Sequence, residues 1–173
     1  MIETKRLLLR EMTEEDVEAL YRVLGDRDIM RHYPYAFDEA RVRAWIASNL
    51  ERYRVFGFGL WAVCLKETGE MIGDCGLTMQ RINGTIRPEI GYHIRGDQQR
   101  KGYAAEAASA VRDWAFANTP FRVLYSYMKE ANLPSAKTAM AYGCRQVDAF
   151  TDDAGETSLV FALSREEWAG LSR

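Results

Sequence analysis

Six consecutive residues have the types and the order that bind an anionic phosphate group: Gln99, Arg100, Lys101, Gly102, Tyr103 and Ala104. The glycine lets the backbone approach a ligand closely, and the two basic residues add local positive charge. A strand-like run precedes these residues, and a helix with an alanine-rich face follows them. Free backbone amides and the positive dipole end at the start of a helix form an anion site. The pattern therefore predicts a phosphate-binding loop; the alternative is an ordinary loop between strand and helix whose charges are solvated.

Other phosphate-binding motifs fit this loop less well. A Walker loop needs Gly-Lys followed by Ser or Thr, whereas Lys101 precedes Gly102 here and Tyr103 follows. The dinucleotide-binding fingerprint needs three closely spaced glycines, which the loop lacks. The sequence therefore favours neither of these two classes.

A second polar cluster lies where a later strand ends and a helix begins. Asn132 follows the strand, Pro134 suits a first helical turn, and Ser135 comes next. Asn and Ser at such a junction usually cap the helix. Taken alone, this segment favours capping over a functional role.

The hydrophobic pattern predicts a mixed α/β scaffold for these clusters. The first half indicates a short strand over 6–12, two amphipathic helices, and strands over 60–66, 71–79 and 86–94. The second half alternates between a helix over 103–117, a strand over 123–128, a helix over 134–142, strands over 146–150 and 157–163, and a short last helix. Antiparallel hairpins followed by one parallel crossover are expected. Because no linker or repeat interrupts the pattern, we predict a single domain over residues 1–173.

Composition and charge exclude several classes of function. The formal net charge of −2 gives no general attraction to nucleic acid. Three widely spaced cysteines and two histidines form neither a disulfide framework nor a zinc-binding pattern, so we expect no metal. The chain shows no signal peptide and no apolar span long enough for a membrane. We therefore expect a cytoplasmic protein that binds neither nucleic acid nor membrane.

Taken together, the two polar segments resemble the GNAT superfamily of acyl-CoA N-acyltransferases. The opening Thr4-Lys-Arg-Leu-Leu-Leu-Arg10, followed by Glu15-Asp16, is similar to the RimJ/RimL-like branch in particular. That branch also shows an Ile-Gly-Tyr triplet, the six-residue loop, a Glu-Ala pair and an Asn-x-x-Ser segment, matched here by 90–92, 99–104, 106–107 and 132–135. The resemblance covers nearly the whole chain in the expected order. Each piece is common alone, but the joint pattern is specific.

The resemblance implies a GNAT-like fold of the α/β class (an α+β mixed sheet). Its central, mostly antiparallel sheet is flanked by helices and splayed open between the fourth strand (86–94) and the fifth (123–128). The pantetheine arm of acetyl-CoA would lie in the opening and pair with backbone groups around Tyr92, His93 and Ile94. Amides of the six-residue loop would hold the pyrophosphate. Further contacts would come from the second half of the chain: Asn132 and Ser135 along the pantetheine arm, and Lys137 at a phosphate, unless it is a solvated helix lysine.

The reaction that the resemblance implies is direct attack of an amine on the thioester carbonyl. It requires a proton acceptor, an oxyanion donor and a proton donor for the departing thiolate. A backbone amide near Ile94 is the donor to the oxyanion in this family. Strand alternation places Glu89, Gly91 and His93 on one face, although a bulge, frequent in this strand of the family, would shift that register. Glu89 is the first choice of base and His93 the second; the alternatives are a partly exposed strand charge and a packed imidazole.

The residue that would protonate the thiolate is less defined. Many relatives carry a tyrosine in the second helix at the position of Ala139. Tyr142 lies about one turn further along that helix, and Ser135 is the other choice, because the branch often has serine there. A thiolate also leaves with little help from an acid, so this role can be empty.

Three functions from different classes are compatible with these observations. The main prediction is an acetyl-CoA-dependent N-acetyltransferase. The others are a non-catalytic acyl-CoA-binding sensor or regulatory module and a structural domain whose loop binds nothing. The acceptor would be a primary amine on a small molecule or a protein N-terminus, and the mixed charges of residues 16–53 do not select between them. Homodimers are common in the superfamily, and the sequence leaves the oligomeric state open.

Overall fold

The computed structural model describes residues 1–171, whose strands form an eight-stranded mixed sheet. The strand order is β1-β2-β3-β4-β5-β6-β8-β7, and every neighbouring pair is antiparallel except β5 and β6. The strands are β1 (Ile2–Glu3), β2 (Leu7–Arg10), β3 (Leu60–Leu65), β4 (Met71–Ile82), β5 (Thr85–Ile94), β6 (Val123–Lys129), β7 (Arg145–Thr151) and β8 (Thr157–Ser164). This confirms the expected fold class and the single parallel crossover.

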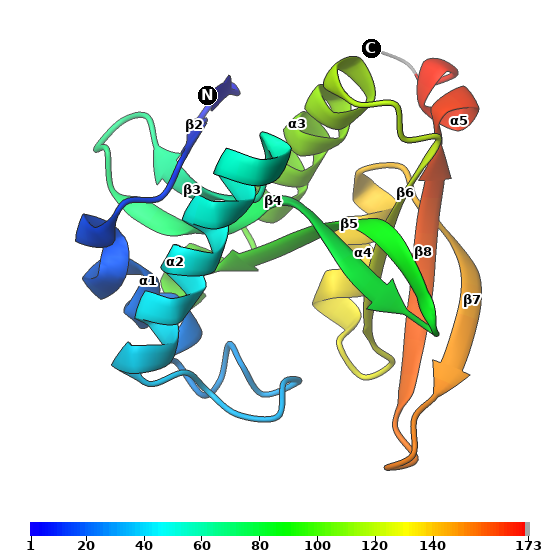
Figure 1. Cartoon of the computed structure of the whole chain (residues 1–173), viewed down its shortest axis with the longest axis horizontal. Helices are drawn as coiled ribbons and strands as arrows, with labels where there is room; N and C mark the ends of the chain where they lie inside the picture. The colour runs from blue at the N-terminus through cyan, green and yellow to red at the C-terminus, as the bar shows by residue number, and fades with distance from the viewer. Residues whose placement is uncertain (172–173) are drawn as a thin grey trace.

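Helices cover both faces of the sheet. Figure 1 shows α1 and α2 in front of the sheet and α3 and α4 behind it. Their bounds are α1 (Val17–Leu24), α2 (Glu39–Phe56), α3 (Tyr103–Asn118), α4 (Leu133–Ala141) and α5 (Arg165–Ala169), with 3₁₀ turns η1 (Glu14–Asp16) and η2 (Gly96–Gln98). Two hydrophobic clusters result, one that includes residues of α1, α2, β3 and β4 and a larger one that includes residues of α3 and α4.

Local sequence signals place several helix starts. Thr13 and Ser164 each cap the helix that follows them in a full capping box, with Asp16 and Glu167 as the reciprocal partners. On α3, the alanines that face the sheet have no exposed surface: Ala107, Ala108 and Ala115. Because these side chains are small, the start of α3 lies close to the strands that it covers.

The sheet opens between β5 and β6. These parallel strands are paired at one position, Glu89 with Tyr125, whereas β4 and β5 are paired without interruption from Gly73–Ile94 to Ile82–Thr85. Past the Glu89–Tyr125 pair, the carboxyl ends of β5 and β6 therefore diverge. The predicted splay is confirmed, and the bulge that would have shifted the register of this strand is absent from the β4–β5 pairing.

Two boundaries differ from the sequence-based expectation. Ile2–Glu3 forms an additional edge strand, because Ile2 pairs with Leu9 on β2. The second hairpin strand continues to Ile82 instead of ending at Met79. Its last polar residues pair with those that open β5, and this regular ladder extends the hairpin beyond the hydrophobic run on which the prediction was based.

Candidate active site

The predicted phosphate-binding loop has an unusual backbone. Arg100 and Gly102 both adopt the left-handed conformation, with φ of 62° and 82°, and an arginine there is uncommon. Left-handed residues in a turn direct successive amides to one side and form an anion-binding concavity. The side-chain amide of Gln99 donates to the Ile94 carbonyl at 2.9 Å, which ties the loop to the end of β5. Helix α3 then begins at Tyr103 with its positive dipole end at the loop.

The start of α3 is anchored to the N-terminal segment through Glu106. Its carboxylate accepts hydrogen bonds from the Thr4 hydroxyl at 2.6 Å, the Arg6 amide at 3.1 Å and the Arg6 Nε at 2.8 Å. The Arg6 guanidinium lies 4.3 Å from the centre of the Tyr103 ring. It also stands 3.4 Å from where a Cβ on Gly102 would lie. The sequence motifs include Thr4, Arg6 and Glu106, but they do not predict that these residues contact one another. About a hundred residues separate Glu106 from the other two in the sequence.

Alternate backbone groups of β5 face the gap. The Ile90 carbonyl accepts from Ser126 Oγ on β6, and the Ile94 carbonyl accepts from Gln99. By strand alternation the backbone of Tyr92 points the same way. The His93 carbonyl instead faces β4, since it lies 2.0 Å from a Cβ built on Gly73. Of the three residues expected to present backbone groups to a pantetheine arm, the geometry therefore directs Tyr92 and Ile94 into the gap and His93 away from it.

The start of α4 forms the other wall of the gap. Asn132 caps this helix by accepting from the Ser135 amide at 3.3 Å. The Tyr92 hydroxyl donates to the Ser135 carbonyl at 2.7 Å, and the Ser135 hydroxyl lies 3.4 Å from the Tyr92 hydroxyl. The structure thus brings Tyr92 and Ser135 together across the gap, while Lys137 is exposed on α4.

Tyr142, a predicted proton donor, is in the core. Its side chain has no exposed surface, and its hydroxyl lies 2.7 Å from Ser126 Oγ, which itself donates to the Ile90 carbonyl. Burial raises the pKa of this phenol well above its ordinary value. The placement makes Tyr142 a buried link between the end of α4 and Ser126 on β6.

Glu89 lies on the face of β5 that α1 and α2 cover, beside the point where the strands separate. Burial raises the pKa of its carboxyl group to about 8, against the opposing effects of a hydrogen bond from the Tyr127 amide and of His93. Its Oε1 lies 3.6 Å from where a Cβ on Gly91 would stand. The absent side chain of Gly91 therefore leaves the carboxylate open on one side. A carboxyl group with a pKa near neutrality is suited to accept and release protons.

His93, on the same face, is part of a hydrogen-bonded chain. Its Nδ1 lies 2.8 Å from Asp74 Oδ1, and its Nε2 lies 2.9 Å from the Tyr33 hydroxyl. The Trp45 indole N–H donates to the other oxygen of Asp74 at 3.0 Å. Burial disfavours the imidazolium, but the charge and hydrogen bond of Asp74 and the charge of Glu89 outweigh it, so the pKa of His93 is raised.

Sequence reasoning missed Asp74. Asp74 lies in a run that reads as an ordinary strand, and its cross-strand partner His93 follows only from the register of β4 and β5. The one available signal was the charge of Asp74 within a strand segment of small and apolar residues. A charged residue is seldom fully buried, as Asp74 is, unless a partner satisfies it.

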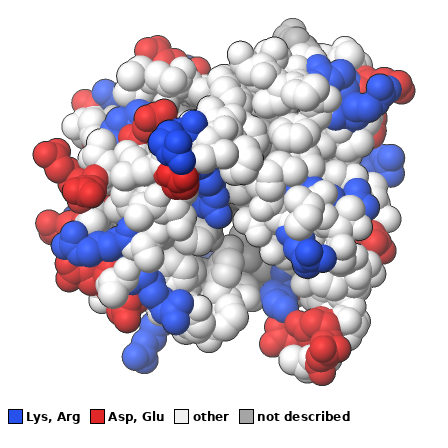
Figure 2. Space-filling model, in the orientation of Figure 1, with Lys and Arg blue, Asp and Glu red and all other residues white. Residues whose placement is uncertain are grey.

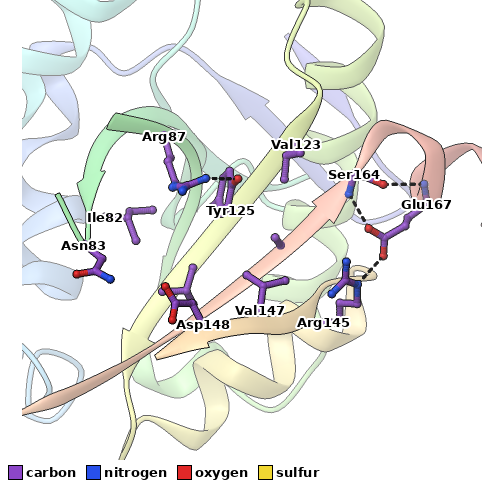
Figure 3. A pocket seen from close by; sticks show the side chains of 12 residues that line it. Ile82, Asn83, Arg87, Val123, Tyr125, Arg145, Val147, Asp148, Ser164 and Glu167 are labelled. Atoms are coloured by element: carbon purple, nitrogen blue, oxygen red, sulfur yellow. Dashed lines mark hydrogen bonds and ion pairs between the residues drawn. The ribbon is translucent and has the colours of Figure 1, made fainter. Parts of the chain in front are cut away.

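The described residues line two surface pockets, one of them on the acceptor side of the site. One, of about 560 Å³, is walled by the loop between α1 and α2, including Tyr33, and by Lys129, Glu130 and the turn between β7 and β8. Figure 2 shows acidic side chains gathered at the lower right, where Figure 1 places that turn. The other pocket lies between the tip of the β4–β5 hairpin and strands β6, β7 and β8, at the opposite end of β5 from the Gln99 to Ala104 loop, and in it Arg87 contacts Tyr125 (Figure 3).

No helix within residues 1–171 is long and apolar enough to cross a bilayer. The same residues contain no group of three or more potential metal ligands.

The fold and the site together define a class: mixed α/β proteins in which an opened sheet leads to a left-handed loop at the start of a helix. More particularly, the chain belongs to the acetyltransferase (GNAT) domain family, whose pattern matches residues 6–145. It is 33% identical to the protein YkkB of Bacillus subtilis over 141 residues, which are 81% of this chain and 82% of that protein. The protein is an acetyltransferase, and members of its family use acetyl-CoA.

Solved structures have the same fold. An acetyltransferase of the GNAT family from Bacillus anthracis superposes with a TM-score of 0.83 at 23% identity, covering 95% of this chain and 98% of that chain. RimL, a ribosomal L7/L12 alpha-N-protein acetyltransferase solved with coenzyme A, gives a TM-score of 0.76 at 17% identity, covering 93% and 95% of the two chains. At these identities the likeness shows the fold alone.

Proposed function

We propose that the chain transfers the acetyl group of acetyl-CoA to a primary amine by direct attack of the amine. The observation that carries this proposal is the path along β5, which passes from the Glu89 carboxylate through the gap-facing backbone of Tyr92 and Ile94 to the left-handed loop. That path offers a proton acceptor, backbone hydrogen bonds and an anion site in one line. The coenzyme A complex of RimL, a protein of the same fold, supports the choice of co-substrate.

The residues of the gap fit acetyl-CoA. Its pyrophosphate would meet the amides of the loop from Gln99 to Ala104, together with the guanidinium of Arg6. Its pantetheine arm would pair with the backbone of Tyr92 and Ile94 and pass Asn132 and Ser135. What acetyl-CoA supplies is an activated acetyl group on a thiol that leaves readily.

The chain's own groups would then divide the proton chemistry. Glu89 accepts a proton from the amine, and the Ile94 amide, which faces the gap, donates to the developing oxyanion. The hydroxyl pair of Ser135 and Tyr92 lies on the wall from which the thiolate departs, so either can supply a proton. The burial of Tyr142 removes it from this part of the proposal.

The first test is Glu89→Gln, which keeps the shape of the side chain but no longer accepts a proton. We expect kcat to fall by roughly 10²–10⁴-fold, the usual contribution of a general base, with acetyl-CoA affinity unchanged. Because the base must be ionised, the parent's kcat should rise with pH through about 8, and the variant should lose this limb. The measurement is thiol release from acetyl-CoA with peptide N-termini, diamines and aminoglycosides as acceptors.

Two controls keep this test interpretable. The three cysteines are buried, so the folded protein should add little to the thiol signal. The stability of Glu89→Gln should equal or exceed that of the parent above pH 8, because a carboxyl group whose folded-state pKa is raised stabilises at low pH and loses that contribution as it ionises. Acetyl-CoA binding without turnover of any amine would favour the second function, a non-catalytic acyl-CoA sensor.

A further inference from the structure

A buried carboxylate holds His93 in one orientation on the acceptor side of the gap. Asp74 is fully buried, and its two oxygens face two donors, the Trp45 indole N–H at 3.0 Å and His93 Nδ1 at 2.8 Å. A carboxylate only accepts hydrogen bonds, so Nδ1 must carry a proton whatever the charge of the ring. In the neutral imidazole the lone pair is then on Nε2.

A hydrogen-bond donor, the Tyr33 hydroxyl, already lies beside this lone pair. The Tyr33 hydroxyl lies 2.9 Å from Nε2, and Tyr33 belongs to the loop between α1 and α2, where 43% of the residue's surface is exposed. The Tyr33 and His93 rings are in contact, with centroids 5.4 Å apart. Because Tyr33 comes from an exposed loop that lines the larger pocket, its hydroxyl is the group that another donor can replace.

No side chain covers the β5 backbone between Glu89 and His93. Glu89 and His93 lie on the same face of β5 with Gly91 between them, and a Cβ on Gly91 would meet only Glu89 Oε1 at 3.6 Å and Leu60 Cδ2 at 3.7 Å. An amine nitrogen placed over Gly91 would therefore have the Glu89 carboxylate beside it and would approach His93 Nε2 from the position that the Tyr33 hydroxyl now occupies.

We propose that His93 is a second catalytic proton acceptor and that Asp74 is the positioning residue that keeps its Nε2 free to accept. The inference rests on the proposed acetyl transfer. The acceptor enters as an ammonium ion, and its nitrogen must lose two protons while the new N–C bond forms and the thioester C–S bond breaks. His93 takes the first proton, which makes the amine nucleophilic, and Glu89 takes the second as the tetrahedral centre forms. One proton finally leaves with the thiol and the other passes to solvent.

The charged groups around His93 come from four elements. Asp74 on β4 and Glu89 on β5 favour the imidazolium. Tyr33 is on the loop between α1 and α2, and Arg52 on α2 acts on Asp74. Since the negative groups dominate, replacing Asp74 by a neutral residue should lower the titration midpoint of His93.

The decisive variant is Asp74→Asn, which preserves shape but reverses the hydrogen bond. Its amide oxygen can still accept from Trp45 while its NH₂ donates to His93 Nδ1, so the ring proton moves to Nε2. With ¹⁵N-labelled protein, long-range proton–nitrogen spectra report the tautomer, and His32→Gln identifies the signal of His93 because the chain has two histidines. We expect the Nδ1–H form in the parent and the Nε2–H form, with a lower titration midpoint, in the variant.

Kinetic measurements distinguish a positioning role of Asp74 in catalysis from a purely structural role. With any amine that the parent acetylates, Asp74→Asn should lower kcat on the order of 10²-fold, the scale of one general base, and change KM less. Acetyl-CoA affinity should match that of the parent, because the phosphate-binding loop is not touched. Tyr33→Phe should leave the His93 tautomer unchanged, since Asp74 alone sets it.

Three results would overturn the inference. An Nε2–H tautomer in the parent would remove the free acceptor, and an unchanged tautomer in Asp74→Asn would remove the role of Asp74. A tautomer change without loss of kcat would make the arrangement purely structural. Failure of the parent to bind acetyl-CoA or to turn over any amine would instead overturn the proposed function, which the spectra do not test.

Discussion

At the scale of single residues, the site is organised by the two faces of β5. Odd-numbered side chains from Glu89 to His93 face α1 and α2, where proton acceptors gather, and Tyr92 faces α4, where hydroxyl groups gather. Gly91 lies between the two proton acceptors and has no side chain. The missing side chain is as important to the arrangement as the groups beside it, because it leaves room for a reacting atom next to a carboxylate.

Gly91→Ala tests this use of empty space. The new methyl group would make ordinary contacts with Glu89 and Leu60, so the fold should tolerate it, with stability unchanged or raised by about 0.4–1 kcal/mol. Because it occupies the position proposed for the amine, kcat/KM should fall roughly 10²-fold. Gly170→Ala, at the end of α5, is the matched control and should leave kcat/KM at the parent's value. A fully active Gly91→Ala enzyme would place the acceptor elsewhere.

At the scale of elements, contacts between distant segments position the phosphate-binding loop. The sequence indicated the loop and the helix after it, because these features depend on neighbours along the chain. It could not indicate that Glu106 on α3 would bind Thr4 and Arg6, or that Asp74 would face His93. Those pairs depend on packing and strand register, which a local pattern does not encode.

Glu106→Ala tests whether the N-terminal segment positions the start of α3. Three donors from Thr4 and Arg6 would lose their acceptor, so we expect the free energy of unfolding to fall by about 1–3 kcal/mol. Acetyl-CoA affinity should fall with it, because Arg6 and the loop lose their common anchor. Chemical denaturation and calorimetry measure the two effects.

Glu51→Ala is the comparison for Glu106→Ala. It breaks an exposed ion pair with Arg54 on α2, so the free energy of unfolding should stay close to that of the parent. If Glu106→Ala bound acetyl-CoA as tightly as this control does, the anchor would stabilise the fold without shaping the loop.

At the scale of the whole molecule, the two faces of the sheet meet at the opening between β5 and β6 and carry different groups there. The side covered by α3 and α4 presents the proposed anion site, and the side covered by α1 and α2 presents Glu89 and His93. A co-substrate held from one side and an acceptor entering from the other would meet where β5 and β6 separate. This division of the two ligands depends on acetyl-CoA binding at the Gln99 to Ala104 loop.

The most direct test is a calorimetric titration with acetyl-CoA of the parent, Gly102→Glu and Gly84→Glu. The two glycines have nearly the same left-handed backbone, with φ of 82° and 84°, so both substitutions add the same strain and the same charge. Gly84 lies at the tip of the β4–β5 hairpin, at the opposite end of β5 from the loop. We predict that the parent and Gly84→Glu bind and that Gly102→Glu, although folded by circular dichroism, does not. Equal binding by all three, or no binding by the parent, would contradict the account.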